Sequence, residues 1–314
     1  MSYRVLAINP GSTSTKIAVY DDLTPVFEVT LRHDPVELDK YGGIIEQYEF
    51  RKQLVMQAMK ENNVAPETLN AVVGRGGLMR PVSGGTFKIC DNMLRDLKDP
   101  SLWGRIHASN LGPFISDAIA KELSIPGFIV DPVVVDEFDD IARISGIPEI
   151  ERKSLLHALN IRYIARLLAA ELGKDFHAVN MIGVHMGGGI SVAAIKQGRA
   201  VDVNNALLGM GPFSPQRCGA LPIGDLLELA FSGKYTHKDL INRLTKTGGY
   251  MAYLGTDSGI EVENRVAAGD QEAELIQRAM CYQVAKEIGA CATVLCGKVD
   301  AIFMSGGLVF NPVV

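Results

Sequence analysis

The sequence predicts an α/β protein of two domains that share one duplicated core. Two apolar strand–turn–strand units, residues 4–20 and 180–195, follow the same pattern. A second pair of apolar strands, residues 70–78 and 300–308, runs into Gly-Gly after a helical stretch. Because both pairs occur in the same order, they indicate two copies of one mixed α/β unit. With a boundary near residues 146–149, we expect domains of residues 1–148 and 149–314.

The composition is that of an ordinary folded protein. The length of 314 residues is enough for about two domains. The composition, 47% hydrophobic and 21% charged, argues against disorder. The 31 Lys and Arg against 36 Asp and Glu give a net charge of −5. Nucleic-acid binders usually carry a basic surplus, so we expect no nucleic-acid partner.

Neither a leader peptide nor a membrane span is indicated. Residues 3–8 already have the pattern of a strand, and no apolar run approaches the roughly 20 residues that cross a bilayer. The five cysteines are scattered and form no Cys-x-x-Cys pair, which argues against a disulfide scaffold or a cysteine metal site. We expect a cytoplasmic protein with no membrane partner.

The remaining elements complete the two copies. Residues 108–123 predict a helix, residues 127–131 a short buried strand, and residues 154–172 a long helix that ends at Gly173. The two strands of the second pair are farther apart in sequence than the two units of the first pair, so the second copy contains extra residues. The natural place for this insertion is residues 205–265. Ligands of such sheets bind at strand ends, so two facing halves would hold the site in a cleft between the domains.

The turn after the first strand suits a phosphate group. In residues 9–16, Asn9 ends the strand, small residues let backbone N–H groups approach an anion, and Lys16 adds a positive charge. The spacing is not that of a P-loop. The alternative, on this turn alone, is an ordinary hairpin rich in turn-forming residues.

The turn after the matching strand is a second candidate. His185 ends the strand and could donate to a phosphoryl oxygen, and Gly187, Gly188 and Gly189 follow it. Three successive glycines cost backbone entropy between strands, so they indicate a close approach by a ligand. The alternative for His185 is a satisfied, half-buried histidine, but the pairing of the two turns favours phosphate binding.

The motifs, taken in order, resemble the acetokinase family, and the match runs along essentially the whole chain. They are NPGSTSTK (9–16), GRGG (74–77), RIHASN (105–110), VDP (130–132), LLHALN (155–160), HMGGGIS (185–191), FSPQRCG (213–219) and MSGGL (304–308). The resemblance implies two domains with duplicated ribonuclease-H-like cores, the actin-like ATPase fold, and a catalytic cleft between them.

The resemblance also implies roles for single residues. Arg75 would bind the carboxylate substrate and neutralise charge during transfer, and Arg217 would share that role from the other domain. Planar guanidinium groups suit carboxylate and phosphoryl oxygens alike. The alternative for Arg217 is a solvated loop arginine. The alternative for Arg75 is a surface arginine in a turn, which the glycines on both sides disfavour. The ATP phosphates would lie against a first loop with Asn9, Ser12, Ser14 and Lys16 and a second loop with Gly187, Gly188 and Gly189. Gly306 and Gly307 match the loop that lies against adenosine, and close packing of strand and helix is the alternative there.

Three further residues match family positions near the active site. Asp131 would organise Mg²⁺ and its waters or orient an arginine, although an Asp before proline commonly starts a turn. His157 matches a catalytic histidine, with a packed core histidine as the alternative. His107 would contact the substrate, or it could belong to a helix cap.

The chain departs from the family pattern at its end. Family members of this type continue for a few dozen residues beyond the position of Val314, and a glutamate in that segment matches a proposed Mg²⁺ ligand. On this comparison, we expect the sequence to record part of the natural protein.

The implied activity is reversible transfer of the γ-phosphoryl group of ATP to a short-chain carboxylate, with Mg²⁺ as cofactor and a homo-oligomer as the assembly. The two turns resemble the butyrate-type branch more than the acetate-type branch, and Pro212, Phe213 and Pro215 could line an acyl pocket or merely stiffen a loop. An acetate or propionate kinase is the nearest alternative. A chaperone- or actin-like ATPase switch has no carboxylate for Arg75 and Arg217 to bind, and a sugar kinase would need an aspartate base.

Overall fold

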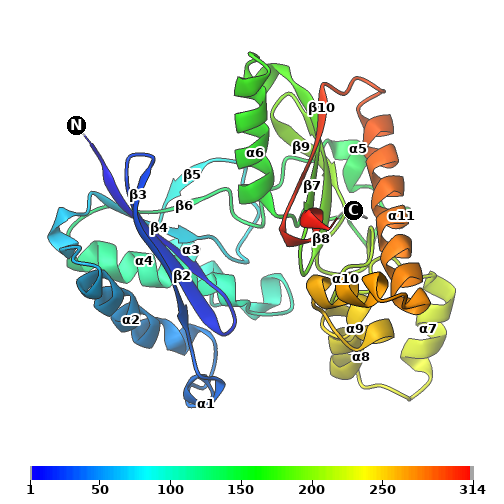
Figure 1. Ribbon diagram of the computed structural model, residues 1–314, viewed down its shortest axis with the longest axis horizontal. Coiled ribbons are helices and arrows are strands. Elements are labelled where there is room, and N and C mark those ends of the chain that lie inside the picture. The colour runs from blue at the N-terminus through cyan, green and yellow to red at the C-terminus, as the bar shows by residue number, and fades with distance from the viewer. Residues whose placement is uncertain (1, 312–314) are drawn as a thin grey trace. The chain divides into compact units, whose positions relative to one another are not determined.

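The computed structural model describes residues 2–311, and its contacts divide the chain into two compact units (Figure 1). Unit 1 is Met1–Val135 and unit 2 is Asp136–Val314. The sequence places the division between residues 148 and 149, so helix α5 (Asp140–Arg143) belongs to the first domain by the sequence and to unit 2 by the contacts. The predicted boundary and the predicted cleft both stay predictions.

Unit 1 is built on a mixed sheet whose strand order, within the described residues, is β3-β2-β1-β4-β6-β5. Its strands are β1 (Arg4–Pro10), β2 (Ser14–Asp21), β3 (Thr24–Arg32), β4 (Ala71–Arg75), β5 (Thr86–Lys88) and β6 (Gly127–Val130). Its helices are α1 (Pro35–Leu38), α2 (Tyr48–Glu61), α3 (Asp91–Asp96) and α4 (Leu111–Glu122).

One hydrophobic core joins this sheet to α2 and α4. Alternate residues of β1, such as Leu6 and Ile8, point to the same face because side chains alternate along a strand. They pack with Met59 of α2 and Ile115 of α4, all of which are buried. The carboxyl ends of β1 and β4 are therefore held side by side at one edge of the core.

Unit 2 repeats the arrangement with a sheet whose order, within the described residues, is β10-β7-β8-β9. Its strands are β7 (Asn180–Met186), β8 (Ile190–Lys196), β9 (Arg199–Val203) and β10 (Ala301–Ser305). Its longer helices are α6 (Ala158–Glu171) and α11 (Gln271–Val294), and shorter ones are α7 (Ile223–Phe231), α8 (His237–Thr245), α9 (Gly249–Leu254) and α10 (Gly259–Ala267).

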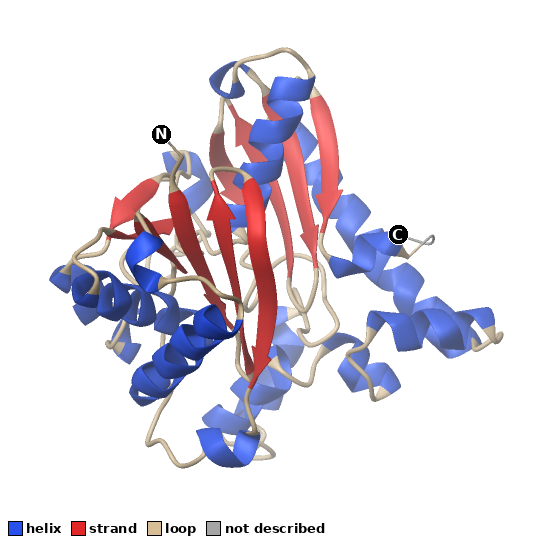
Figure 2. Ribbon diagram, turned by 60° about the vertical axis from the view of Figure 1, so that its left-hand side comes forward, coloured by secondary structure: helices blue, strands red, loops and turns tan. Residues whose placement is uncertain are grey.

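The two sheets confirm the predicted duplication. In unit 1, β1 pairs antiparallel with β2 and parallel with β4. In unit 2, β7 pairs antiparallel with β8 and parallel with β10. In the two sheets, drawn in red in Figure 2, β1 and β7 thus have the same kinds of neighbour, one antiparallel strand and one parallel strand.

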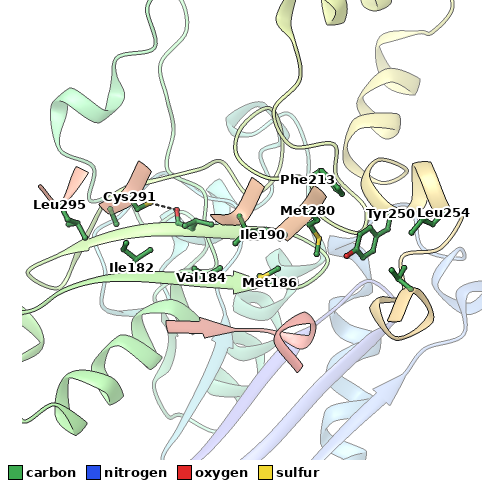
Figure 3. Packing of buried hydrophobic residues seen from close by; sticks show 14 of the residues in the cluster. Ile182, Val184, Met186, Ile190, Phe213, Tyr250, Leu254, Met280, Cys291 and Leu295 are labelled. Atoms are coloured by element: carbon green, nitrogen blue, oxygen red, sulfur yellow. Dashed lines mark hydrogen bonds between the residues drawn. The ribbon is translucent and has the colours of Figure 1, made fainter. Parts of the chain in front are cut away.

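The core of unit 2 packs α11 against the sheet. Figure 3 shows Val184 and Met186 of β7 and Met280 and Cys291 of α11 within this core. In Figure 1, α6 and α11 lie on either side of the sheet. The helices α7 to α10 occupy the region where the sequence predicts an insertion. No helix within residues 2–311 is long and apolar enough to cross a membrane.

One predicted element begins later than expected. The sequence predicts a helix over residues 154–172, but α6 begins at Ala158, and His157 precedes it with non-helical backbone angles (φ −78°, ψ 58°). The preceding residues 154–156 are buried and belong to no helix or strand, and the carbonyl of Leu155 accepts a hydrogen bond from the N–H of Ala206. These tertiary contacts outweigh local helix propensity.

Candidate functional site

In unit 1, the predicted substrate arginine lies beside the first residue of the predicted phosphate turn. Asn9 and Arg75 lie at the carboxyl ends of β1 and β4, directly after the paired residues Ile8 and Gly74. Arg75 Nη1 donates to Asn9 Oδ1 across 3.2 Å. Burial lowers the pKa of Arg75 from its ordinary value, although an arginine remains charged at neutral pH. The strand register therefore places a partly buried cation at the turn.

Close glycine packing brings three sequence motifs together around Arg75. A side chain at Gly76 would come within 2.5 Å of Pro132, and one at Gly77 within 2.4 Å of Asn110 Oδ1. That same oxygen accepts a hydrogen bond from the N–H of Leu78 at 2.9 Å. The motifs GRGG, RIHASN and VDP thus form one packed assembly in which only glycine fits after the arginine.

The turn at residues 11–14 is exposed at Ser12 and partly exposed at Ser14, as a phosphate cradle requires. Gly11 N–H closes the turn on the carbonyl of Ser14 at 2.7 Å. Lys16 lies on β2, and its Nζ pairs with Glu28 Oε1 at 2.8 Å. The structure therefore gives the charge of Lys16 a carboxylate partner within the hairpin.

Asp131 and His107 lie in unit 1, and each accepts a hydrogen bond from a backbone N–H of that unit. Asp131 is 1% exposed, adopts φ 38°, and its Oδ1 accepts from the N–H of Gly85 at 2.7 Å. His107 Nδ1 accepts from the N–H of Ser109 at 3.2 Å and caps the 3₁₀ helix Ala108–Asn110. With Nδ1 accepting, a neutral His107 carries its proton on Nε2, and its predicted substrate contact stays a prediction.

In unit 2, two predicted active-site histidines lie against each other. The rings of His157 and His185 stack with centroids 4.1 Å apart and planes 25° from parallel. His185 Nδ1 lies 2.9 Å from Asn160 Oδ1, and His157 Nδ1 lies 2.9 Å from Ser191 Oγ. Ser305 Oγ also donates to Asn160 Oδ1, at 2.5 Å. Side chains from α6, β8 and β10 thus hold the pair, and β7 supplies His185 itself.

The contact with Asn160 determines that Nδ1 of His185 is protonated. The amide oxygen of Asn160 can only accept, so His185 Nδ1 carries a proton and donates to it. The other ring nitrogen, Nε2, then accepts when the ring is neutral and donates when it is charged. The contact with Asn160 thus fixes the role of Nδ1 and leaves that of Nε2 to the charge of the ring, and the predicted phosphoryl contact stays a prediction.

Arg217, the second predicted arginine, packs against the glycine turn of unit 2. A side chain at Gly189 would lie 2.0 Å from Arg217 Nη1, which donates to the carbonyl of Ala206. Ser214 Oγ donates to the carbonyl of Gly188 at 2.7 Å, and Gly187 N–H closes the turn on Gly189 at 3.0 Å. Arg217 and the turn are therefore one packed unit.

The two glycines after β10 differ in their surroundings. Gly306 has φ 94°, a left-handed conformation, and a side chain there would lie 2.2 Å from the carbonyl of Met186. At Gly307, nothing lies within 4 Å of the position that a side chain would take. Gly306 is thus required by the backbone, whereas the position beside Gly307 is open space.

The residues predicted to line an acyl pocket are buried in unit 2. Phe213 is 7% exposed and lies against Tyr250, as Figure 3 shows. Pro215 is also buried, and its carbonyl accepts a hydrogen bond from Met251. Core packing accounts for Phe213 without a ligand, and the acyl-pocket role of Pro215 stays a prediction.

Several residues of these assemblies are absent from the sequence prediction. Asn160, Ser191 and Ser305 lie within the motifs but were given no role there. Arg51 is fully buried beneath the first turn. Its one sequence signal is helical spacing, since it lies four residues before Val55 on the face of α2 that packs in the core.

Comparison with known proteins gives consistent results. A sequence profile of the acetokinase family matches residues 149–313. Butyrate kinase 1 of Clostridium acetobutylicum is 52% identical over 309 residues, which cover 98% of this chain and 86% of that protein.

Solved structures resemble the fold at lower sequence identity. The acetate kinase of Porphyromonas gingivalis has a TM-score of 0.79 at 19% identity, covering 98% of this chain and 83% of that one. A propionate kinase from Francisella tularensis has a TM-score of 0.77 at 18% identity, covering 99% of this chain and 85% of that one. At these identities the likeness establishes the two-domain, actin-like fold.

Proposed function

The chain belongs to the acetokinase family and is a carboxylate phosphotransferase, and we propose that it phosphorylates butyrate or a closely related short-chain acid with ATP. The observation that carries the acid is the 52% identity to a butyrate kinase over almost the whole chain. The reaction is reversible and yields ADP and an acyl phosphate. Acetate or propionate is the alternative acid.

The chemistry requires positioning and charge stabilisation rather than a base. A carboxylate is already ionised at neutral pH, so its oxygen can attack the γ-phosphorus directly. The bond from that phosphorus to the β,γ-bridging oxygen breaks, and ADP leaves. Arg75 binds the carboxylate, and Arg217 and His185 stabilise charge on the phosphoryl oxygens. His157 supports His185 through their stacked rings.

The two turns bind the phosphates of ATP. In unit 1 Ser12 is exposed and Ser14 is partly exposed, and both carry hydroxyl donors of the kind that bind anions. In unit 2 Gly188 is the exposed residue of the turn, between Gly187 and the buried Gly189, and its backbone N–H is the donor that we assign to the phosphates. The open space at Gly307 suits the adenosine.

Asp131 is the residue that would hold Mg²⁺. Within residues 2–311, no cluster of three or more His, Cys, Asp or Glu side chains could bind a metal ion. Magnesium commonly uses one or two carboxylates together with waters and nucleotide phosphates, so a single carboxylate fits. The ion would neutralise charge on the phosphates.

We also propose that the enzyme is a cytoplasmic homo-oligomer, as the family resemblance implies. Light scattering of the purified protein measures the assembly directly, and a monomeric mass at micromolar concentration would remove that part of the proposal.

An acyl hydroxamate assay tests the reaction. Purified protein with ATP, Mg²⁺, butyrate and hydroxylamine should accumulate butyryl hydroxamate, because hydroxylamine traps the acyl phosphate. ATP turnover at the same rate without any carboxylate would overturn the proposal and favour an ATPase switch.

A further inference from the structure

A buried arginine holds the underside of the first turn in unit 1. Arg51 Nη1 donates to the carbonyls of Gly11 at 2.7 Å and Ser14 at 3.1 Å. Arg51 Nη2 donates to the carbonyl of Ser12 at 2.9 Å. One side chain of α2 thus contacts three of the four carbonyl groups in the turn.

The fourth carbonyl is also engaged, which leaves donors on the outside. The N–H of His33 donates to the carbonyl of Thr13 at 2.9 Å. The N–H of Gly11 closes the turn on Ser14. Within residues 2–311, the N–H groups of Ser12 and Thr13 donate to no protein atom, and both residues are exposed. A turn whose carbonyl groups are all hydrogen-bonded within the protein, and whose exposed residues keep N–H groups available, is suited to bind an anion.

The charge of Arg51 is not balanced by a carboxylate within the described part of the chain. The side chain is 1% exposed, and its remaining partners are the neutral oxygens Thr15 Oγ1 at 3.3 Å and Gln47 Oε1 at 2.8 Å. Burial lowers the pKa of Arg51 to about 10, so it stays protonated at neutral pH. A buried charge without a counter-charge is costly, and an anion at the turn would provide one.

We propose that Arg51 is a positioning residue for phosphoryl transfer, which holds the first turn in its anion-binding form and places a positive charge beneath the bound phosphate. The inference rests on the proposed function, because it takes the phosphates of ATP as the anion. It differs from the roles of Arg75 and Arg217, since Arg51 acts through the backbone of the turn.

The test compares affinity for ATP with affinity for adenosine, which lacks phosphates. Arg51→Met should weaken binding of ATP with Mg²⁺ by about 10- to 100-fold, the range expected when hydrogen bonds to a charged group are lost. Binding of adenosine should be unchanged. Arg51→Lys keeps the charge but not the planar fork, so it should recover part of the ATP affinity. Isothermal titration calorimetry measures all of these constants.

Two further variants keep the test decisive. Gln47→Leu removes the acceptor of Arg51 Nη2 without removing the charge, and it should weaken ATP binding by less than Arg51→Met. If Arg51→Met does not fold, the ratio of ATP affinity to adenosine affinity is measured for Arg51→Lys and Gln47→Leu instead. Arg162→Met with Glu137→Gln is the matched control, since it removes another buried arginine, with its 2.6 Å ion pair, in unit 2. The control should leave the ratio unchanged.

The outcomes separate this inference from the proposed function. An unchanged ratio of ATP to adenosine affinity in the folded Arg51 variants would overturn the inference, while hydroxamate formation by the wild type would still support the kinase. Wild-type protein that binds ATP but forms no hydroxamate would overturn the kinase and leave the role of Arg51 at the turn intact.

Discussion

Arg75 Nη1 donates to Asn9 Oδ1 across 3.2 Å, at the ends of two neighbouring parallel strands. The position of the guanidinium group therefore depends on the register of β1 and β4, which the core beneath them maintains. Such an arrangement limits how far Arg75 can move, and a pre-organised cation stabilises developing charge without reorganising.

The first prediction is that Arg75→Ala lowers kcat by about 10²- to 10³-fold, the usual cost of one charge-stabilising donor. Stability should change little, because the removed side chain lies at the end of its strand. Steady-state kinetics and thermal unfolding measure the two effects. Arg80→Ala is the control, since Arg80 lies in the same unit with an exposed side chain that pairs with the partly buried Asp96. A wild-type kcat in Arg75→Ala would remove Arg75 from the site.

The second prediction concerns Arg217 and Gly189, the glycine that packs against it. Arg217→Ala should lower kcat by about 10²- to 10³-fold, and Arg217→Lys should recover only part. Gly189→Ala should also lower kcat, because the new methyl group would lie 2.0 Å from Arg217 Nη1 and displace it. Gly224→Ala is the control, since Gly224 is an exposed glycine on α7 of the same unit, outside both turns, with nothing within 4 Å of the new methyl group. Equal kcat values in the two alanine variants would contradict the packing argument.

Most of the fold and part of the site could be predicted from sequence patterns. The duplicated strands and their Gly-Gly ends lie in short stretches, so periodicity and turn residues locate them. The support beneath the turns could not be found in this way, because Arg51 is 36 to 40 residues from the atoms it contacts in the turn. The predicted start of α6 was also wrong, since the residues before Ala158 are non-helical and make contacts distant in sequence, such as that of Leu155 with Ala206.

The third prediction is that unit 1 loses stability in acid through His33. Its Nε2 is hydrogen-bonded to Thr15 Oγ1, and the charged group facing it is Arg51. Burial, with a smaller contribution from Arg51, lowers the pKa of His33 to about 4, against 6.5 when unfolded. The unfolded chain therefore binds more protons between these values, so stability is full above about pH 6.5 and falls as the pH drops toward 4.

This loss should reach roughly 2 kcal/mol between pH 7 and pH 5, since one pKa unit corresponds to about 1.4 kcal/mol. Urea unfolding at both pH values measures it, with the fluorescence of Trp103, the chain's single tryptophan, reporting on unit 1. In His33→Gln, the difference between the two pH values should shrink by that amount. An unchanged difference would show that His33 does not couple protonation to folding.

The fourth prediction separates packing from substrate contact at Phe213. Because this ring lies in the core against Tyr250, Phe213→Ala should destabilise the protein by about 3–5 kcal/mol. The ratio of kcat/KM for butyrate to that for acetate should not change in the folded fraction. A lower ratio would instead support the acyl-pocket role that the sequence suggests for the segment before Arg217.

The last prediction is that butyrate or isobutyrate is used with a kcat/KM at least several-fold above that for acetate. The 52% identity to a butyrate kinase supports the longer acid, as do the residues that follow Asn9 and His185 in the two turns. Each additional buried CH₂ favours the longer acid by up to about 0.8 kcal/mol, so two give roughly tenfold. Such a modest preference implies overlapping use of propionate, isobutyrate and valerate. The hydroxamate assay with each acid measures the series, and equal or higher efficiency with acetate would reject butyrate while leaving the phosphoryl transfer intact.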